Sequence, residues 1–136
     1  MTINWKNSKG EFKKEVLENF EKNNGVKFPE KYVKIVKNFN GAYPDKNKFD
    51  LENEKEKVFY KLLNWDVNRK NNMIDFYKNH ESHFDSKIIP FGEDPFGNLF
   101  CFNFKNENPS VLYWNHELNQ FTKVAEKFES FLNMLY

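Results

Sequence analysis

Residues 88–104 read IIPFGEDPFGNLFCFNF, and this stretch decides the fold class of the chain. The segment 87–91 predicts a strand, and the segment 92–98 is dense in residues that form turns. The next segment, 99–104, alternates in the way that a strand with two different faces does. One predicted face carries Phe100, Phe102 and Phe104, and the other carries Leu99, Cys101 and Asn103.

Downstream of this stretch, further strands and a helix are predicted. Val111–Trp114 and Gln120–Val124 read as strands, separated by turn-forming residues at 106–109 and 115–119. Closely spaced strands in meander order predict an antiparallel sheet. From about Ala125, helical spacing predicts a last helix. Its apolar side would carry Phe128, Phe131, Leu132 and Leu135.

Upstream, the sequence predicts two short helices. Ser8 and Glu11 form a capping-box pattern, and helical spacing after it predicts a first helix that ends near Gly25. Pro29 suits the first turn of a second helix, which Asn40-Gly41 would stop. With a tight joint between them, the two helices are expected to pack as a hairpin.

The middle of the chain is more polar. In the segment 42–57, the charge run 52–57 indicates a solvated loop or strand edge, and 58–63 could form a strand. A third helix is predicted between Asp66 and His83. The expected fold is α+β, with a central antiparallel β-sheet flanked by an N-terminal helical hairpin and a C-terminal helix. Residues 1–136 have the length of a single domain.

The amino-acid composition indicates which kinds of partner the protein binds and in which cellular compartment it works. The chain has 21 basic and 20 acidic residues, which gives no electrostatic footprint for nucleic acid or an anionic membrane. The one cysteine, Cys101, excludes an internal disulfide and suits a reducing compartment. The polar segment 1–10 does not resemble a signal peptide, so a cytoplasmic location is expected.

Several stretches together resemble a known family. VKFPEKYVKIVKNFNGA (26–42), IIPFGEDPFGNLFCFNF (88–104), VLYWNHE (111–117) and VAEKFESFLNML (124–135) occur in the order typical of the SMI1/KNR4, or SUKH, superfamily. The resemblance implies an antiparallel sheet flanked by helices. For a bacterial chain it implies an immunity protein that neutralises a cognate polymorphic toxin. Fungal relatives act as interaction hubs in cell-wall and signalling control, which implies a regulatory module as the alternative.

The chain departs from this family in one respect. Members often carry an acidic residue where this chain has Asn103, and many members that bind nuclease toxins are acidic. The net charge here is +1, and a balanced surface does not mimic nucleic acid. The sequence therefore does not single out a nuclease as the toxin.

Candidate reactive groups have plainer structural interpretations. His80, His83 and His116 could hold zinc, but His80 and His83 are three residues apart and do not match the H-E-x-x-H spacing. Cys101 could act as a nucleophile with His116, yet it lies in an alternating apolar strand, where cysteine is usually a small buried hydrophobe. Glu93 is adjacent to Asp94 in the predicted turn, so the two carboxylates are expected to point apart. No enzymatic activity, metal or cofactor is expected.

The turn-dense region is instead predicted to bind a protein. Tyr43 and Tyr113 join Phe96 and Trp114 as aromatic residues that could be exposed, and such residues often anchor interfaces. The predicted toxin-binding residues are Asp94, Phe96, Asn98, Asn103, Trp114, His116 and Glu117. When free, the protein is expected to be a monomer or a weak homodimer. A small ligand-binding domain is a further, less favoured alternative.

Overall fold

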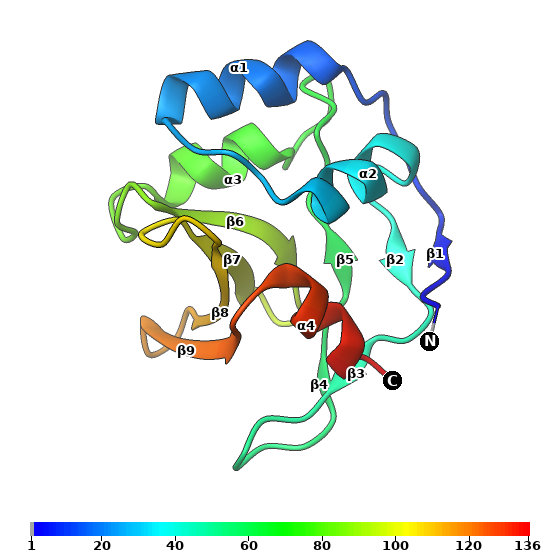
Figure 1. Cartoon of the computed structure of the whole chain (residues 1–136), viewed down its shortest axis with the longest axis vertical. Coiled ribbons are helices and arrows are strands. Elements are labelled where there is room, and N and C mark those ends of the chain that lie inside the picture. Colours follow the sequence, from blue (N-terminus) through cyan, green and yellow to red (C-terminus); the bar gives the residue numbers. More distant parts are fainter. Residues whose placement is uncertain (1) are drawn as a thin grey trace.

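Helices and a β-sheet confirm the predicted α+β class in the computed structural model, which describes residues 2–136. The helices are α1 (Lys14–Asn24), α2 (Glu30–Asn38), α3 (Met73–His80) and α4 (Phe128–Met134). The strands are β1 (Trp5–Lys6), β2 (Tyr43–Pro44), β3 (Lys48–Phe49), β4 (Lys57–Val58), β5 (Lys61–Leu62), β6 (Ile88–Glu93), β7 (Leu99–Asn103), β8 (Ser110–Asn115) and β9 (Gln120–Ala125). Figure 1 shows α4 in front of the sheet and α1 at the opposite end of the molecule.

The main sheet is antiparallel, with strand order β5-β6-β7-β8-β9. The predicted meander from β6 to β9 is therefore confirmed. β1 pairs with β2, and β3 pairs with β4, in two small antiparallel ribbons. The single strand predicted over 58–63 is divided between β4 and β5, because its backbone changes partners there. Phe59 N donates to Asn47 O at 2.8 Å, whereas Tyr60 N donates to Glu93 O at 2.9 Å.

Both faces of β6, β7 and β8 are buried, in the alternation that the sequence predicts. On β7, Phe100 and Phe102 enter the large core beneath α2 and α4. On the opposite face, Leu99 and Cys101 enter a smaller cluster. The buried residues of that smaller cluster are Phe84, Ile88, Leu99, Cys101, Leu112 and Trp114. Segment 76–84 contributes to both clusters, and this is why the sheet has no solvated face here.

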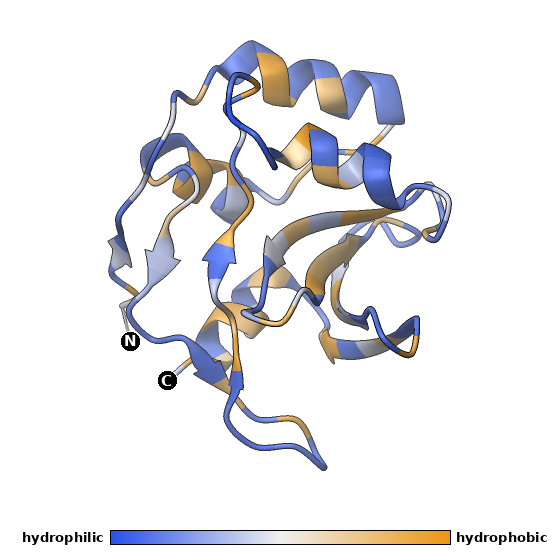
Figure 2. Cartoon of the chain, turned by 180° about the vertical axis from the view of Figure 1, so that it is seen from behind, coloured by the Kyte–Doolittle hydropathy of each residue, from blue (hydrophilic) through white to orange (hydrophobic). Residues whose placement is uncertain are grey.

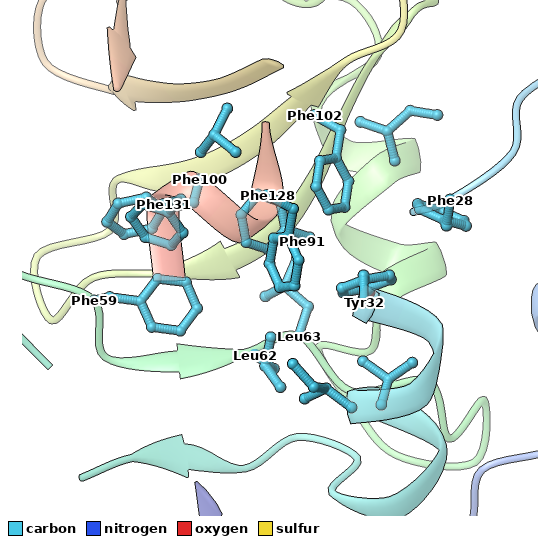
Figure 3. Close-up of a cluster of buried hydrophobic side chains, with 14 of the residues drawn as sticks. Phe28, Tyr32, Phe59, Leu62, Leu63, Phe91, Phe100, Phe102, Phe128 and Phe131 are labelled. Atoms are coloured by element: carbon cyan, nitrogen blue, oxygen red, sulfur yellow. The ribbon is translucent and has the colours of Figure 1, made fainter. Parts of the chain in front are cut away.

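The large core is built mainly from aromatic rings. Figure 3 shows rings from the sheet, α2 and α4 directed toward one another. Phe91 is fully buried among them. Its ring stacks on Phe102 at 4.2 Å between centroids and meets Phe128 at 5.6 Å, nearly edge-on. Offset and edge-on contacts of this kind add to the free energy gained by burying the rings.

Two predicted helix boundaries are wrong at their N-terminal ends. The Ser8–Glu11 capping box does not form, because the amide of Glu11 donates to Asp66 Oδ2 at 2.9 Å and α1 begins only at Lys14. The third helix begins at Met73 because Asn72 caps it, accepting from the amide of residue 75 at 3.0 Å. The predicted end of α1 is confirmed, since Gly25 adopts the left-handed conformation with φ 62°.

Hydropathy follows this architecture. In Figure 2, hydrophobic colours gather on the long strands and on α4, whereas the outer turns of α1 and the loop between β3 and β4 are mainly hydrophilic. None of the helices in residues 2–136 is both long enough and apolar enough to cross a membrane.

Candidate partner-binding site

Two turns meet at one end of the sheet. Alternate turns of an antiparallel meander lie at the same end, which brings the β6–β7 turn (94–98) to the β8–β9 turn (115–119). His116 joins them: its amide donates to Asn98 Oδ1 at 3.0 Å, and its Nε2 lies 2.9 Å from Phe96 O. We call residues 94–98 and 115–119 the sheet tip.

A buried carboxylate fixes the first of these turns. Asp94 Oδ1 accepts from the amides of Phe96 at 2.8 Å and Asn98 at 2.9 Å. Its Oδ2 accepts from the Tyr113 hydroxyl at 2.7 Å and from Asn98 Nδ2 at 2.9 Å. Asn98 Nδ2 also donates to the Tyr113 hydroxyl oxygen at 2.9 Å. Burial, together with the hydrogen bond to Asp94, raises the pKa of Tyr113, so the phenol keeps its proton and donates it.

The fixed turn presents an apolar side chain to solvent. Phe96 is 75% exposed, although the backbone on both sides of it is hydrogen-bonded. Gly97 has φ 89°, a conformation that confirms the turn predicted here and that side chains resist. Across the tip, Leu118 is 64% exposed in the second turn. The tip therefore offers two apolar side chains on a constrained backbone.

Tyr113 and Trp114 are both buried, because adjacent residues of β8 point to opposite faces of a sheet that is covered on both sides. Tyr113 enters the large core and Trp114 the smaller cluster. The indole Nε1 of Trp114 donates to Asn119 Oδ1 at 2.8 Å and so helps to hold the second turn. Lys57 Nζ lies 4.6 Å from the centroid of the Tyr113 ring, which places the end of the β3–β4 loop beside the tip.

Some of the residues predicted to bind the toxin are buried in the structure, and others are exposed to solvent. Asp94, Asn98 and Trp114 are buried, so their side chains can position the tip but do not present a surface of their own. Asp94 and Asn98 face inward because both hydrogen-bond to the Tyr113 hydroxyl, and Trp114 is covered in the smaller cluster. A local turn pattern does not reveal these long-range contacts. Phe96 and His116 are exposed and remain available for contact.

The other two predicted residues lie at different ends of the sheet. Glu117 is exposed in the tip, where its amide donates to Asn115 Oδ1 at 3.0 Å. Asn103 ends β7 at the far end of the sheet, about 13 Å along the strand from the tip, so it does not join the site. Leu118 is an exposed residue of the tip that the sequence does not single out, although an isolated apolar residue in a polar turn is a signal of it.

The hydrogen bonds of Tyr113 lead to a stability prediction. Replacing Tyr113 by phenylalanine should lower the free energy of unfolding by about 1–2 kcal/mol, because Asn98 loses an acceptor and Asp94 loses a donor. Urea denaturation measures this change. Tyr60→Phe is the matched control, since the Tyr60 hydroxyl makes only a 3.5 Å contact with the hydroxyl of Tyr43. Equal losses in both variants would contradict the role assigned to Asp94.

The candidate reactive groups have structural partners. His80 Nδ1 lies 2.8 Å from Phe76 O, and its ring lies 5.3 Å from that of Trp114. Glu93 pairs with Lys61 at 3.6 Å while Asp94 faces the turn, so the two carboxylates have separate partners, as expected. Among residues 2–136, no three His, Cys, Asp or Glu side chains are grouped so as to hold a metal ion.

Cys101 is fully buried, and burial raises the pKa of its thiol. We expect Ellman's reagent at pH 8 to modify the native protein on the order of a thousandfold more slowly than the unfolded chain, because labelling requires local opening of the core. Absorbance at the thionitrobenzoate band gives both rates. Labelling of native protein at the unfolded rate would show an accessible, reactive thiol.

Comparisons with known proteins agree with this architecture. The family model SUKH_6, described as SMI1-KNR4 cell-wall, matches residues 14–132. The chain is also similar to the SPbeta prophage-derived uncharacterized protein YokK of Bacillus subtilis (strain 168), with 27% identity over 140 residues. That match covers 87% of this chain and 71% of the relative. Because the family model spans most of the helices and the whole main sheet, this chain belongs to the SMI1/KNR4 (SUKH) family.

Proposed function

We propose that this protein is an immunity protein, which binds a cognate bacterial toxin domain through the sheet tip and thereby occludes its active site or locks its shape. The observation that carries the proposal is the exposed ring of Phe96 on a turn held by a buried carboxylate. An apolar side chain on a constrained turn costs free energy in water and loses little conformational freedom when a partner covers it.

The surroundings of Phe96 suit a protein interface. Stable interfaces combine a few desolvated aromatic or apolar anchors with a polar rim. Here Phe96 and Leu118 supply the anchors, and His116 and Glu117 supply rim groups. A specific interface buries about 1,600 Å² in total, which exceeds the two turns alone. The neighbouring β3–β4 loop, which Lys57 brings to Tyr113, is the natural extension of the surface.

We further propose that the protein acts by binding alone. The cysteine and the carboxylate that could have taken part in chemistry have structural contacts instead. Cys101 packs in the smaller apolar cluster on one face of the sheet. Both carboxylate oxygens of Asp94 accept hydrogen bonds, from the turn and from Tyr113. The relative named as prophage-derived favours an accessory bacterial role, such as defence against a toxin, over control of a cellular structure.

Co-expression tests this function. The product of the neighbouring gene, taken as the candidate toxin, should arrest growth when it is expressed alone. Growth should recover when this chain is expressed with it, and a complex of the two should co-purify. Phe96→Ala, which removes the exposed ring at the tip, serves as the control for specificity. Continued arrest, with both proteins folded and present, would rule out immunity to that toxin.

A second candidate function follows from the description of the family model that matches this chain, which is 'SMI1-KNR4 cell-wall'. That description favours a regulatory interaction module whose partner is a protein of the same cell. The genomic neighbourhood separates the two candidates. A large toxin-bearing reading frame beside this gene supports immunity, whereas capture of a cell-wall or signalling protein by the same tip supports regulation.

A further inference from the structure

A cationic pocket lies away from the sheet tip, where the segment before α1 meets β2, β5 and the segment before α3. Its volume is about 230 Å³. Among the residues that line it are Lys9, Tyr43, Lys61, Arg69, Lys70 and Glu93. In Figure 1, β2 and β5 run beside each other in this region, and β6 follows on the other side of β5. The pocket thus brings together side chains from distant parts of the sequence.

The charges of the pocket are unbalanced. Lys9, Lys61, Arg69 and Lys70 contribute positive charge, and Glu93 is the one carboxylate in the lining. Glu93 pairs with Lys61 at 3.6 Å. Within residues 2–136, no carboxylate oxygen lies within 4.0 Å of the cationic groups of the other three. The carboxyl of Asp66 lies nearby: hydrogen bonds from the amides of Glu11 and Asn68 lower its pKa, and the charge of Arg69 lowers it further. Lys9 and Lys70 are therefore the two cations of the pocket that lack a close counterion among the described residues, whereas Arg69 has Asp66 beyond 4.0 Å.

The backbone beneath Lys9 is held by two asparagines. Lys9 N donates to Asn40 O at 3.0 Å, and Lys9 O accepts from Asn64 Nδ2 at 2.8 Å. Asn40 Nδ2 adds a second donor to Lys9 O at 3.2 Å. Asn40 is buried, so this part of the pocket wall is anchored to the interior.

Arg69 is held in a similar way. Its amide donates to Asp66 O at 3.1 Å, and its carbonyl accepts from Asn72 Nδ2 at 2.8 Å. A Cβ atom on Gly10 would lie only 2.8 Å from Arg69 Cδ. The Arg69 side chain therefore packs against the glycine that follows Lys9, and both residues line the same pocket. Both side chains are exposed, but their backbone is held, so less conformational freedom is lost on binding an anion than with cations on a mobile loop.

Tyr43 adds a hydroxyl group to the cations that line the pocket. Its hydroxyl oxygen accepts from the Tyr60 hydroxyl at 3.5 Å, which leaves its own proton free to be donated. That hydrogen bond, followed by the nearby charges of Lys61 and Lys9, lowers the pKa of Tyr43. The pocket thus adds a neutral hydrogen-bond donor to its cations.

We propose that this pocket binds a small anion of the phosphate class. Arginine presents a planar fork of donors that matches phosphate oxygens, and lysines add point charges around it. Pockets for drug-sized molecules have volumes of about 300–1,000 Å³, so this pocket suits an anion the size of phosphate or pyrophosphate. The inference does not rest on the proposed toxin partner, because the pocket and the sheet tip share no residue.

Isothermal titration calorimetry with pyrophosphate tests the pocket. At about 50 mM NaCl, where screening is moderate, the full chain should show one saturable site with a dissociation constant on the order of 0.1 mM. Sodium chloride added to the same ionic strength should give no saturable heat. Absence of saturable binding, or equal heats from chloride, would overturn the proposal.

Variants locate the site. Arg69→Gln and Lys9→Gln should each weaken pyrophosphate binding about fivefold, and the double variant about 25-fold, with melting temperatures unchanged in the absence of the anion. Lys127→Gln is the matched control, because Lys127 is an exposed cation at the start of α4, outside the pocket. Unchanged binding in the double variant, or an equal loss in the control, would show that pyrophosphate does not bind here.

Discussion

Replacing Phe96 by alanine is expected to weaken binding to the cognate toxin domain by at least about thirtyfold, which corresponds to about 2 kcal/mol. The ring is 75% exposed in the free protein, so burying it in a complex is a gain that the folded chain alone does not have. The turn is already held by Asp94, so little ordering free energy offsets that gain. Surface plasmon resonance should show the loss mainly as faster dissociation.

The same variant should leave the stability of the free protein within about 0.5 kcal/mol of wild type, because an exposed ring contributes little to folding. Phe39→Ala is the matched control: Phe39 is 39% exposed at the end of α2, away from the tip. Its toxin affinity should be unchanged. Strong binding by Phe96→Ala, with a loss in Phe39→Ala, would move the interface to the helical end of the molecule.

Replacing Phe91 by alanine is expected to have the largest effect on stability, a loss of about 3–5 kcal/mol in the free energy of unfolding. Phe91 is fully buried and stacks on Phe102, with the rings of Phe128 and Tyr32 also packed against it. Removing the ring leaves a cavity that neighbouring rings, fixed from β7, α2 and α4, cannot close. Guanidinium denaturation followed by tryptophan fluorescence measures the loss.

Phe91→Leu separates ring packing from simple burial. Leucine keeps much of the apolar volume, so this variant should lose only about 1–2 kcal/mol. Equal stability of Phe91→Ala and wild type would mean that the aromatic core is not what holds the sheet to α2 and α4.

The local pattern of the sequence is sufficient to predict the meander from β6 to β9, but not the pairing of β5 with β6. The alternation of Phe100 and Phe102 with Leu99 and Cys101 predicts two faces, and the structure fills both. The pattern does not show which helices or segments pack against each face of the sheet. Segment 76–84 returns to the sheet through Phe84, a long-range contact that buries residues on the second face.

The candidate site was predictable in place but not in detail. Turn-forming residues identify the region of Phe96, yet they do not show that Asp94 and Asn98 face inward to Tyr113. Asn103 is close to the predicted site in sequence, but it ends β7, so the length of that strand separates it from the tip. The cationic pocket was not predicted, because its lysines and arginine come from segments that only the fold brings together.

Amide hydrogen exchange, compared between the free chain and its complex with the toxin domain, shows whether the toxin covers the sheet tip. We expect slower exchange in the complex at residues 94–98 and 115–119, with the outer surface of α1 unchanged. Protection confined to α1 and α2, in a complex that forms and neutralises the toxin, would contradict the sheet tip as the binding surface.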